Sequence, residues 1–268
     1  MSLLSWKSLA KGDRDELILS VDFSTSGRTQ ASFADLAPRL DPPAAAFWTT
    51  LPPTADDAVA LDGYVDWWLT DVRESGRRVT AVLGYCAGAV FAAALAERIG
   101  AWQDTPALVL FDPELPNTAG LYKDFHAAGD SLASLLMPEE LTAFHEAGRQ
   151  IERRYADDLP AVGPELALIF TRAVGTAAER LELDDDIRDD LAGVFGSLVG
   201  YLAAASAIDP LPLWARGTAL TSGPPSYPVG RELRFDVDHD DLLRINGVAR
   251  ALSELLSGDR TESTTAGR

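Results

Sequence analysis

The stretch Val82–Val90, with the sequence VLGYCAGAV, decides how the rest of the chain is interpreted. Gly84 and Gly88 bracket Cys86, an apolar run precedes them, and an alanine-rich run follows them. The pattern predicts a strand over 79–84, a tight turn, and a helix over 87–99 that stops at Gly100. The question it raises is why the centre of such a turn holds the only cysteine of the chain.

A strand, the sequence G-x-C-x-G and a helix form the layout of a nucleophile elbow. The nucleophile of an elbow sits in a strained turn, so its neighbours two residues away must lack bulk, as Gly84 and Gly88 do. The helix directs its amino-terminal N–H groups at the site, and the N–H of Ala87 would bind a developing oxyanion. The other interpretation is that Cys86 is a buried free cysteine on a glycine-rich turn.

The composition excludes several classes of function. A chain of 268 residues with a net charge of −18 has no basic surface with which to replace the counterions of nucleic acid or to bind an anionic membrane. The acidic run at 184–186 has no histidine nearby, so we expect a solvated helix face there and no metal or other cofactor. One cysteine allows no internal disulfide, and the first residues lack a signal peptide, so we expect a cytoplasmic protein.

Strands and helices alternate in the first part of the chain, which predicts a mainly parallel sheet covered on both faces. The expected strands here are 17–22, 44–50, 79–84 and 107–111, with a helix over 56–76 that Asp56 would cap. From about 119 to 207 only helices are expected, at 138–155, 164–181 and 186–205. Strands resume at 218–221 and 232–237, and a last helix covers 240–256. We therefore expect one domain over 1–268 with a helical insertion at about 116–210 and a disordered tail at about 258–268.

A cysteine nucleophile needs a base, and the chain contains three histidines. His239 comes after the last expected strand and before the last helix, which is where the chain order nucleophile, acid, histidine requires it. His126 and His145 fall in the helical block, where a partly exposed histidine is unremarkable. His239 is therefore the predicted base.

The acid that orients the histidine is expected at the carboxyl end of a strand. Asp112 ends the strand that follows the elbow helix, whereas the next-to-last strand is followed by TSGPPS, which contains no carboxylate. Asp112 is the predicted acid, and Glu114 and Asp209 are the alternatives. The predicted catalytic set is thus Cys86, Asp112 and His239.

These residues resemble the thioesterases of polyketide synthases and nonribosomal peptide synthetases, which are α/β-hydrolases. The elbow is similar to G-H-S-x-G of that family, and the stretch 238–243, DHDDLL, is similar to its G-D-H-F-x-M-L. Near the start, FSTSGR at 23–28 before SFADLAPRL at 32–40 resembles F-P-x-A-G-G before S-F-x-x-L-A-x-x-L. The resemblance implies that the helical block is a lid and that the N–H of Ser26 is the second oxyanion donor.

The resemblance also implies a substrate and a partner. It implies an acyl thioester carried on the phosphopantetheine arm of an acyl or peptidyl carrier protein, released by hydrolysis, cyclisation or acyl transfer through an acyl-Cys intermediate. The chain departs from the family at the nucleophile, which is Cys86 instead of serine, and at Tyr85, where the family has histidine. Ser24 and Arg28 replace the proline and the second glycine of the early loop.

Two other functions stay open at this point. Dienelactone hydrolases share the fold and have a G-Y-C-x-G elbow, so the chain could be a cysteine hydrolase of a small lactone or ester. They, however, carry the acid after the next-to-last strand and lack a long helical lid. The second alternative is a non-catalytic protein that binds a carrier protein on a hydrolase fold.

Overall fold

The computed structural model describes residues 3–23, 30–41, 45–51, 63–155 and 157–263. The chain forms two compact units. The first comprises Met1–Leu115 and Ile208–Arg268, and the second is Pro116–Ala207. Among the residues just given, no helix is long and apolar enough to cross a membrane.

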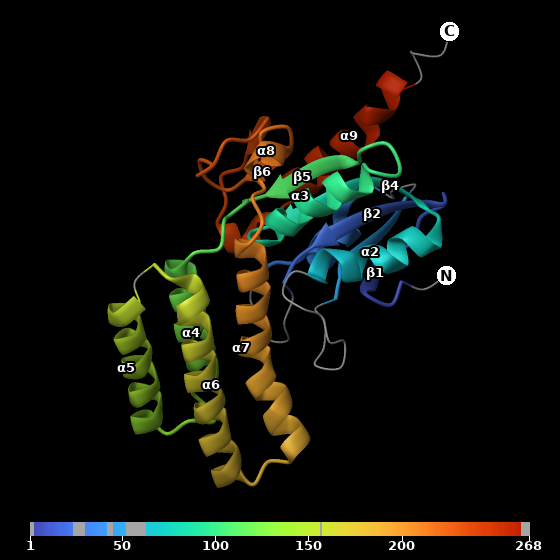
Figure 1. Cartoon of the computed structure of the whole chain (residues 1–268). Helices are drawn as coiled ribbons and strands as arrows, with labels where there is room; N and C mark the ends of the chain where they lie inside the picture. The colour runs from blue at the N-terminus through green and yellow to red at the C-terminus, as the bar shows by residue number, and fades with distance from the viewer. Residues whose placement is uncertain (1–2, 24–29, 42–44, 52–62, 156, 264–268) are drawn as a thin grey trace. The chain divides into compact units, whose positions relative to one another are not determined.

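The first unit is built on a seven-stranded sheet with the order β1-β3-β2-β4-β5-β6-β7 (Figure 1). The strands are β1 (Trp6–Ala10), β2 (Glu16–Val21), β3 (Ala46–Thr50), β4 (Arg78–Tyr85), β5 (Ala107–Phe111), β6 (Thr218–Thr221) and β7 (Arg231–Arg234). Within this sheet, β1 pairs with β3 in the antiparallel sense, and all other neighbours are parallel. Because parallel strands end at a common edge, the residues that follow β4, β5, β6 and β7 lie along one edge.

Helices cover the two faces of this sheet. They are α1 (Phe33–Leu36), η1 (Ala37–Arg39), α2 (Tyr64–Ser75), α3 (Gly88–Ile99), α8 (Leu211–Trp214), η4 (His239–Arg244) and α9 (Asn246–Ser263), where η marks a 3₁₀ helix. On one face, Phe47 and Phe111 of the sheet form a buried cluster with Phe33 of α1 and with apolar residues of η4 and α9. On the other face, Phe91 of α3 packs edge-on against Trp68 of α2. Alternate residues of each strand therefore enter different cores.

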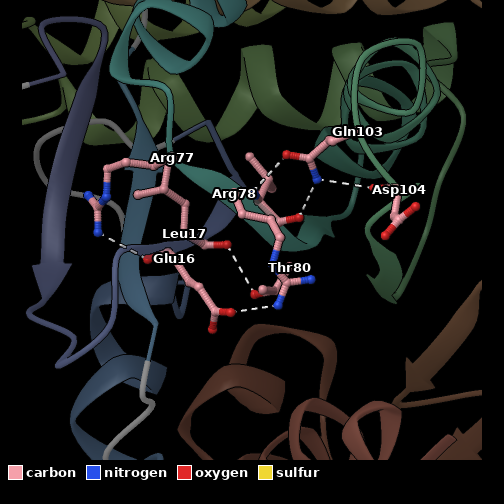
Figure 2. Close-up of polar contacts among 8 residues, drawn as sticks. Glu16, Leu17, Arg77, Arg78, Thr80, Gln103 and Asp104 are labelled. Carbon is pink, nitrogen blue, oxygen red and sulfur yellow. Dashed lines mark hydrogen bonds and ion pairs between the residues drawn. The ribbon is translucent and has the colours of Figure 1, made fainter. Parts of the chain in front are cut away.

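Polar contacts hold the amino ends of β2 and β4 (Figure 2). The side chain of Gln103 accepts a hydrogen bond from the Val79 N–H (3.0 Å) and donates one to the Val79 carbonyl (2.7 Å). Thr80 Oγ1 donates to the carbonyl of Leu17 across the two strands at 3.2 Å. These contacts fix the register at the end of the sheet opposite the edge where β4 leads into the elbow.

The second unit is all helical in its described part (Figure 1). Its helices are α4 (Thr118–Ser131), α5 (Pro138–Tyr155), α6 (Leu159–Leu181) and α7 (Asp185–Ser206). Phe125 and Phe144 stack with ring centroids 4.2 Å apart, and both contribute to a cluster with Phe170 and Phe195. This aromatic cluster is the core that joins the four helices.

Several predicted elements are confirmed and others are wrong. Strands β5 and β6 have the predicted bounds. The sequence patterns missed β1, because its outward-facing residues are polar and the strand is defined by its pairing with β3. They also missed α4, whose glycines lower helix propensity but which Asn117 caps by accepting the Gly120 N–H at 2.8 Å.

The ends of other elements differ from prediction. Helix α6 begins at Leu159 and includes Pro164, because Asp158 caps it by accepting the Ala161 N–H at 3.1 Å. The predicted helix 240–256 is divided into η4 and α9, and the second of these extends through Ser263 into the predicted disordered tail. Asp56 and the predicted start of helix α2 lie outside the described residues.

Candidate active site

Cys86 occupies the turn between β4 and α3. Its backbone has a φ of 52°, in the left-handed region that residues with a side chain rarely adopt. Its N–H donates to the Phe111 carbonyl at 2.9 Å, and its carbonyl accepts the Ala89 N–H at 3.1 Å. The turn is therefore strained and held by its neighbours, and the thiol is half-buried.

Gly84 allows α3 to pass close to β4. A Cβ atom on Gly84 would lie 2.5 Å from Ala89 Cα and 2.7 Å from Ala92 Cβ, closer than atoms in contact can lie. No side chain therefore fits at position 84 unless the helix moves away from the strand. Gly88 is the first residue of α3 and is buried.

Of the two predicted oxyanion donors, the described residues include only Ala87. Ala87 precedes α3 as its N-cap residue, so its N–H belongs to the group of amides at a helix start that have no acceptor within the helix. Ser26 lies outside the described residues.

Asp112 follows β5 and reaches the predicted histidine. His239 Nδ1 lies 2.8 Å from Asp112 Oδ2, and the backbone of Asp112 also has a positive φ, of 42°. Two hydrogen bonds from Ser222 hold the carboxylate: its N–H donates to Oδ1 at 2.7 Å and its hydroxyl donates to Oδ2 at 2.6 Å. The structure thus brings Asp112 and His239 together across the ends of β5, β6 and β7.

The hydrogen bonds on Asp112 determine its charge. Burial by itself raises the pKa of this carboxyl, but the hydrogen bonds from His239 and Ser222 outweigh it and hold the pKa below its ordinary value. An ionised Asp112 only accepts hydrogen bonds, so Nδ1 of His239 carries the hydrogen and Nε2 is left as the basic nitrogen.

Tyr85, the last residue of β4, contacts His239 through its hydroxyl and through its ring. The Tyr85 hydroxyl donates to the His239 carbonyl at 2.7 Å, and the two rings stack with centroids 5.0 Å apart. In addition, the Ala31 N–H donates to the Asp240 carbonyl at 2.8 Å. The segment that carries the imidazole is thus fixed to both the elbow strand and the loop before α1.

The two alternative acids, Asp209 and Glu114, make other contacts. Asp209 Oδ1 accepts the Leu211 N–H at the start of α8 (3.1 Å). Glu114 contacts the predicted nucleophile: the Cys86 thiol donates to Glu114 Oε2 at 3.8 Å, and the Glu114 N–H donates to the Cys86 carbonyl at 3.3 Å.

His126 and His145 form a pair in the helical unit. Their Nδ1 atoms lie 2.8 Å apart, and His145 Nε2 lies 3.0 Å from Asp130 Oδ1. Burial, together with the charges of His145 and Arg149, lowers the pKa of His126. Within the described residues, no group of three or more His, Cys, Asp or Glu side chains could hold a metal ion.

Sequence reasoning did not find the role of Ser222 or the contact of Glu114 with Cys86. A serine after a strand is too common to be informative, and Ser222 reaches Asp112 only because β5 and β6 are neighbours in the sheet. The sequence pattern offers Glu114 only as an alternative partner of the histidine.

No family model and no curated protein matches the chain. Two solved structures superpose on it over nearly their whole length. The Vlm2 thioesterase domain bound with a dodecadepsipeptide has a TM-score of 0.51 and 15% identity, covering 94% of this chain and 98% of that one. The NocB thioesterase domain, in covalent complex with a fluorophosphonate nocardicin G analog, has a TM-score of 0.50 and 15% identity, covering 94% and 99%.

The chain has the α/β-hydrolase fold. The predicted fold class is confirmed by these similarities and by the mainly parallel sheet. At 15% identity the two structures establish the fold only. In this fold the candidate site lies along the carboxyl edge of the sheet, from the elbow after β4 to the start of η4.

Ser222→Ala tests the support of Asp112. The folded pKa of Asp112 is depressed, so its contribution to stability is present above the unfolded value of about 4 and is lost as the pH falls through the folded value. Loss of one hydrogen bond to a charged group should lower the free energy of unfolding by about 1.5–3 kcal/mol at neutral pH. Urea denaturation near neutral pH and at about pH 3 measures this difference, which should shrink in acid.

Ser226→Ala is the matched control, because Ser226 is exposed in the same loop. It should leave the free energy of unfolding unchanged at both pH values. A loss in Ser222→Ala that persists undiminished in acid would mean that the hydroxyl contributes by packing and not by binding the carboxylate.

Proposed function

We propose that this α/β-hydrolase is a thioesterase-like enzyme that takes an acyl chain from the phosphopantetheine thioester of a carrier protein onto Cys86. The observation that carries the proposal is the contact of 2.8 Å between His239 Nδ1 and Asp112 Oδ2, on the sheet edge where Cys86 occupies its strained turn. A histidine oriented by a carboxylate, on the same sheet edge as an elbow thiol, is the set of groups that nucleophilic acyl transfer requires.

In the first half-reaction, Nε2 of His239 takes the proton of the Cys86 thiol. Asp112 keeps the hydrogen on Nδ1 and stabilises the imidazolium. The thiolate attacks the thioester carbonyl, and the Ala87 N–H at the start of α3 binds the oxyanion. The imidazolium then returns its proton to the departing pantetheine sulfur, which leaves as a thiol.

In the second half-reaction, an acceptor attacks the acyl-Cys86 thioester. Transfer between two thiols is nearly thermoneutral, whereas a serine would store the acyl group as a more stable oxyester. An acyl-Cys intermediate therefore stays reactive towards an acceptor. The polyketide or nonribosomal peptide pathway and the carrier protein come from the sequence resemblance. The role of the helical unit as a lid also stays a prediction.

The position of the acid supports a thioesterase over a dienelactone hydrolase. A dienelactone hydrolase carries its acid after the next-to-last strand, where this chain has Ser222, and Ser222 donates to Asp112 from that position. The positive φ angles of Cys86 and Asp112 disfavour a non-catalytic role. Strained backbone angles destabilise the folded state, and they cluster at functional sites.

Cys86→Ala tests the nucleophile. The turn should persist, since alanine occupies less space at the same backbone angles, while turnover of acyl-N-acetylcysteamine thioesters should fall by at least about 100-fold. Intact-mass spectrometry should find an acyl adduct on the wild type and none on Cys86→Ala. Cys86→Ser is the matched variant and should accumulate acyl-enzyme or give more hydrolysed acid. An adduct of equal yield on Cys86→Ala would place the nucleophile elsewhere.

His239→Ala tests the base. Loss of a general base costs about 100- to 10,000-fold, so kcat should fall by that order. His145→Ala is the control, and it should change kcat by less than about threefold although thermal unfolding shifts downward through loss of the pair with His126. A severe loss of kcat in the control with His239→Ala tolerated would overturn the assignment.

Asp112→Asn tests the orienting acid. Asparagine tolerates a positive φ, so the backbone should be retained. Because a thiol ionises near neutral pH, we expect a loss in kcat of about 10- to 1,000-fold, less than for the corresponding serine triad. Steady-state kinetics of the two proteins measures the ratio, and an unchanged kcat would exclude Asp112 from the mechanism.

A further inference from the structure

Two of the three histidines of the chain face each other in the helical unit. His126 on α4 and His145 on α5 approach with their Nδ1 atoms 2.8 Å apart and their ring centroids 5.0 Å apart. On the other side of its ring, Nε2 of His145 lies 3.0 Å from Oδ1 of Asp130, the next-to-last residue of α4. The three side chains thus form one chain of polar contacts that runs from α4 to α5 and back to α4.

Close packing of α4 against α5 positions the two imidazole rings. A Cβ atom on Gly148 of α5 would lie 2.4 Å from Phe125 Cε1 and 3.3 Å from His126 Cε1, so a side chain there would push both rings away. Phe125 stacks on Phe144 with ring centroids 4.2 Å apart, and each of the two contacts the histidine that follows it in the chain. The histidine contact therefore lies beside the aromatic cluster that joins the four helices.

The polar contacts determine how many protons the pair can hold. A carboxylate only accepts hydrogen bonds, so Nε2 of His145 carries a hydrogen towards Asp130, and Nδ1 of the neutral ring accepts from the Nδ1–H of His126. One added proton, on Nε2 of His126, leaves this hydrogen bond in place and makes it charge-assisted. A second proton would have to bind Nδ1 of His145, so that two N–H groups and two positive charges would face each other at 2.8 Å. The contact thus tolerates one proton and excludes two.

We propose that His126 and His145 form an acid-sensitive contact between α4 and α5, which breaks when both imidazoles are protonated. Separation of the rings removes a hydrogen bond beside the aromatic cluster, so α4 and α5 lose stability together. The inference concerns the helical unit by itself and does not depend on the thioesterase function.

Charged groups of both helices act on the pair. Asp130 on α4 and Glu152 on α5 favour a protonated His126, whereas Arg149 on α5 opposes it. Arg149 is itself held by Glu146, with 3.0 Å between Nε and Oε2. From α6 and α7, the side chains that contact the neighbouring rings are the aromatic residues Phe170 and Phe195.

The balance of these effects sets the direction of the pH dependence. Burial, together with the charges of His145 and Arg149, outweighs the two carboxylates and lowers the pKa of His126 from its ordinary value of 6.5. The unfolded chain has the ordinary value, so the folded pKa is the lower of the two. The stability that the pair contributes is therefore complete above about pH 6.5 and is lost as the pH falls through the folded value.

Hydrogen exchange of the full-length protein, measured by mass spectrometry on peptides from α4 and α5, tests the contact. Opening takes up about one proton. After correction for intrinsic exchange rates, protection of these peptides should therefore fall about three- to fivefold between about pH 6.5 and pH 5.5. Peptides from β4 and β5 are the internal reference and should show no such fall. Constant protection of α4 and α5 over this range would overturn the proposal, and this readout needs no variant.

His126→Gln shows whether the pair is the source of the pH dependence. Glutamine can donate to or accept from Nδ1 of His145 without taking up a proton, so α4 and α5 should keep constant protection between the two pH values. Glu139→Gln is the matched control, since Glu139 is exposed on α5, and it should retain the wild-type fall. A fall of equal size in His126→Gln would assign the pH dependence to another group and rule out the proposed contact.

The ¹⁵N signals of the imidazoles in NMR spectra report the protons directly. In the wild type the pair should take up its two protons in two separate steps, because the first proton opposes the second. In His126→Gln the remaining His145 should take up one proton in a single step. Two identical and independent steps in the wild type would contradict the proposal, since the rings would then not interact.

Discussion

Helix α3 passes so close to strand β4 at Gly84 that a single added carbon would meet Ala89 and Ala92 at less than 3 Å. This approach leaves only two residues between strand and helix, so Cys86 must take a left-handed backbone and its thiol stands out from the turn. The same geometry places Cys86 directly before the amino end of α3, where the helix dipole is positive. The strain at Cys86 and its position before the helix thus follow from one close contact.

Parallel pairing supplies the rest of the site. Tyr85 pairs with Phe111, and Phe111 with Leu220, so β4, β5 and β6 end side by side. The residues just beyond, Cys86, Asp112 and Ser222, therefore share one edge, and His239 joins them after β7. The hydrogen bonds of Gln103 and Thr80 at the opposite end of the sheet hold this register. Asp112 stays ionised because three hydrogen bonds replace the water that burial removes.

The charges around Cys86 oppose formation of the thiolate that the proposed mechanism needs. Forming a thiolate at Cys86 favours positive surroundings, but the structure places Glu114 beside the sulfur and another carboxylate on the histidine. A cysteine suits such surroundings better than a serine would, because a thiol ionises without a strong base.

Features that depend on neighbouring residues in the chain could be predicted from the sequence. The glycines around Cys86 predicted the elbow, apolar runs predicted β4, β5 and β6, and chain order selected Asp112 and His239 as the pair that the structure brings together. Which residue lies against each of these groups depends on how the strands and loops are arranged in three dimensions. Ser222 meets Asp112, and Glu114 meets the thiol, because strand order and the backbone angle at the end of β5 direct the side chains there. Local sequence encodes propensity and spacing, whereas such contacts depend on which strands become neighbours.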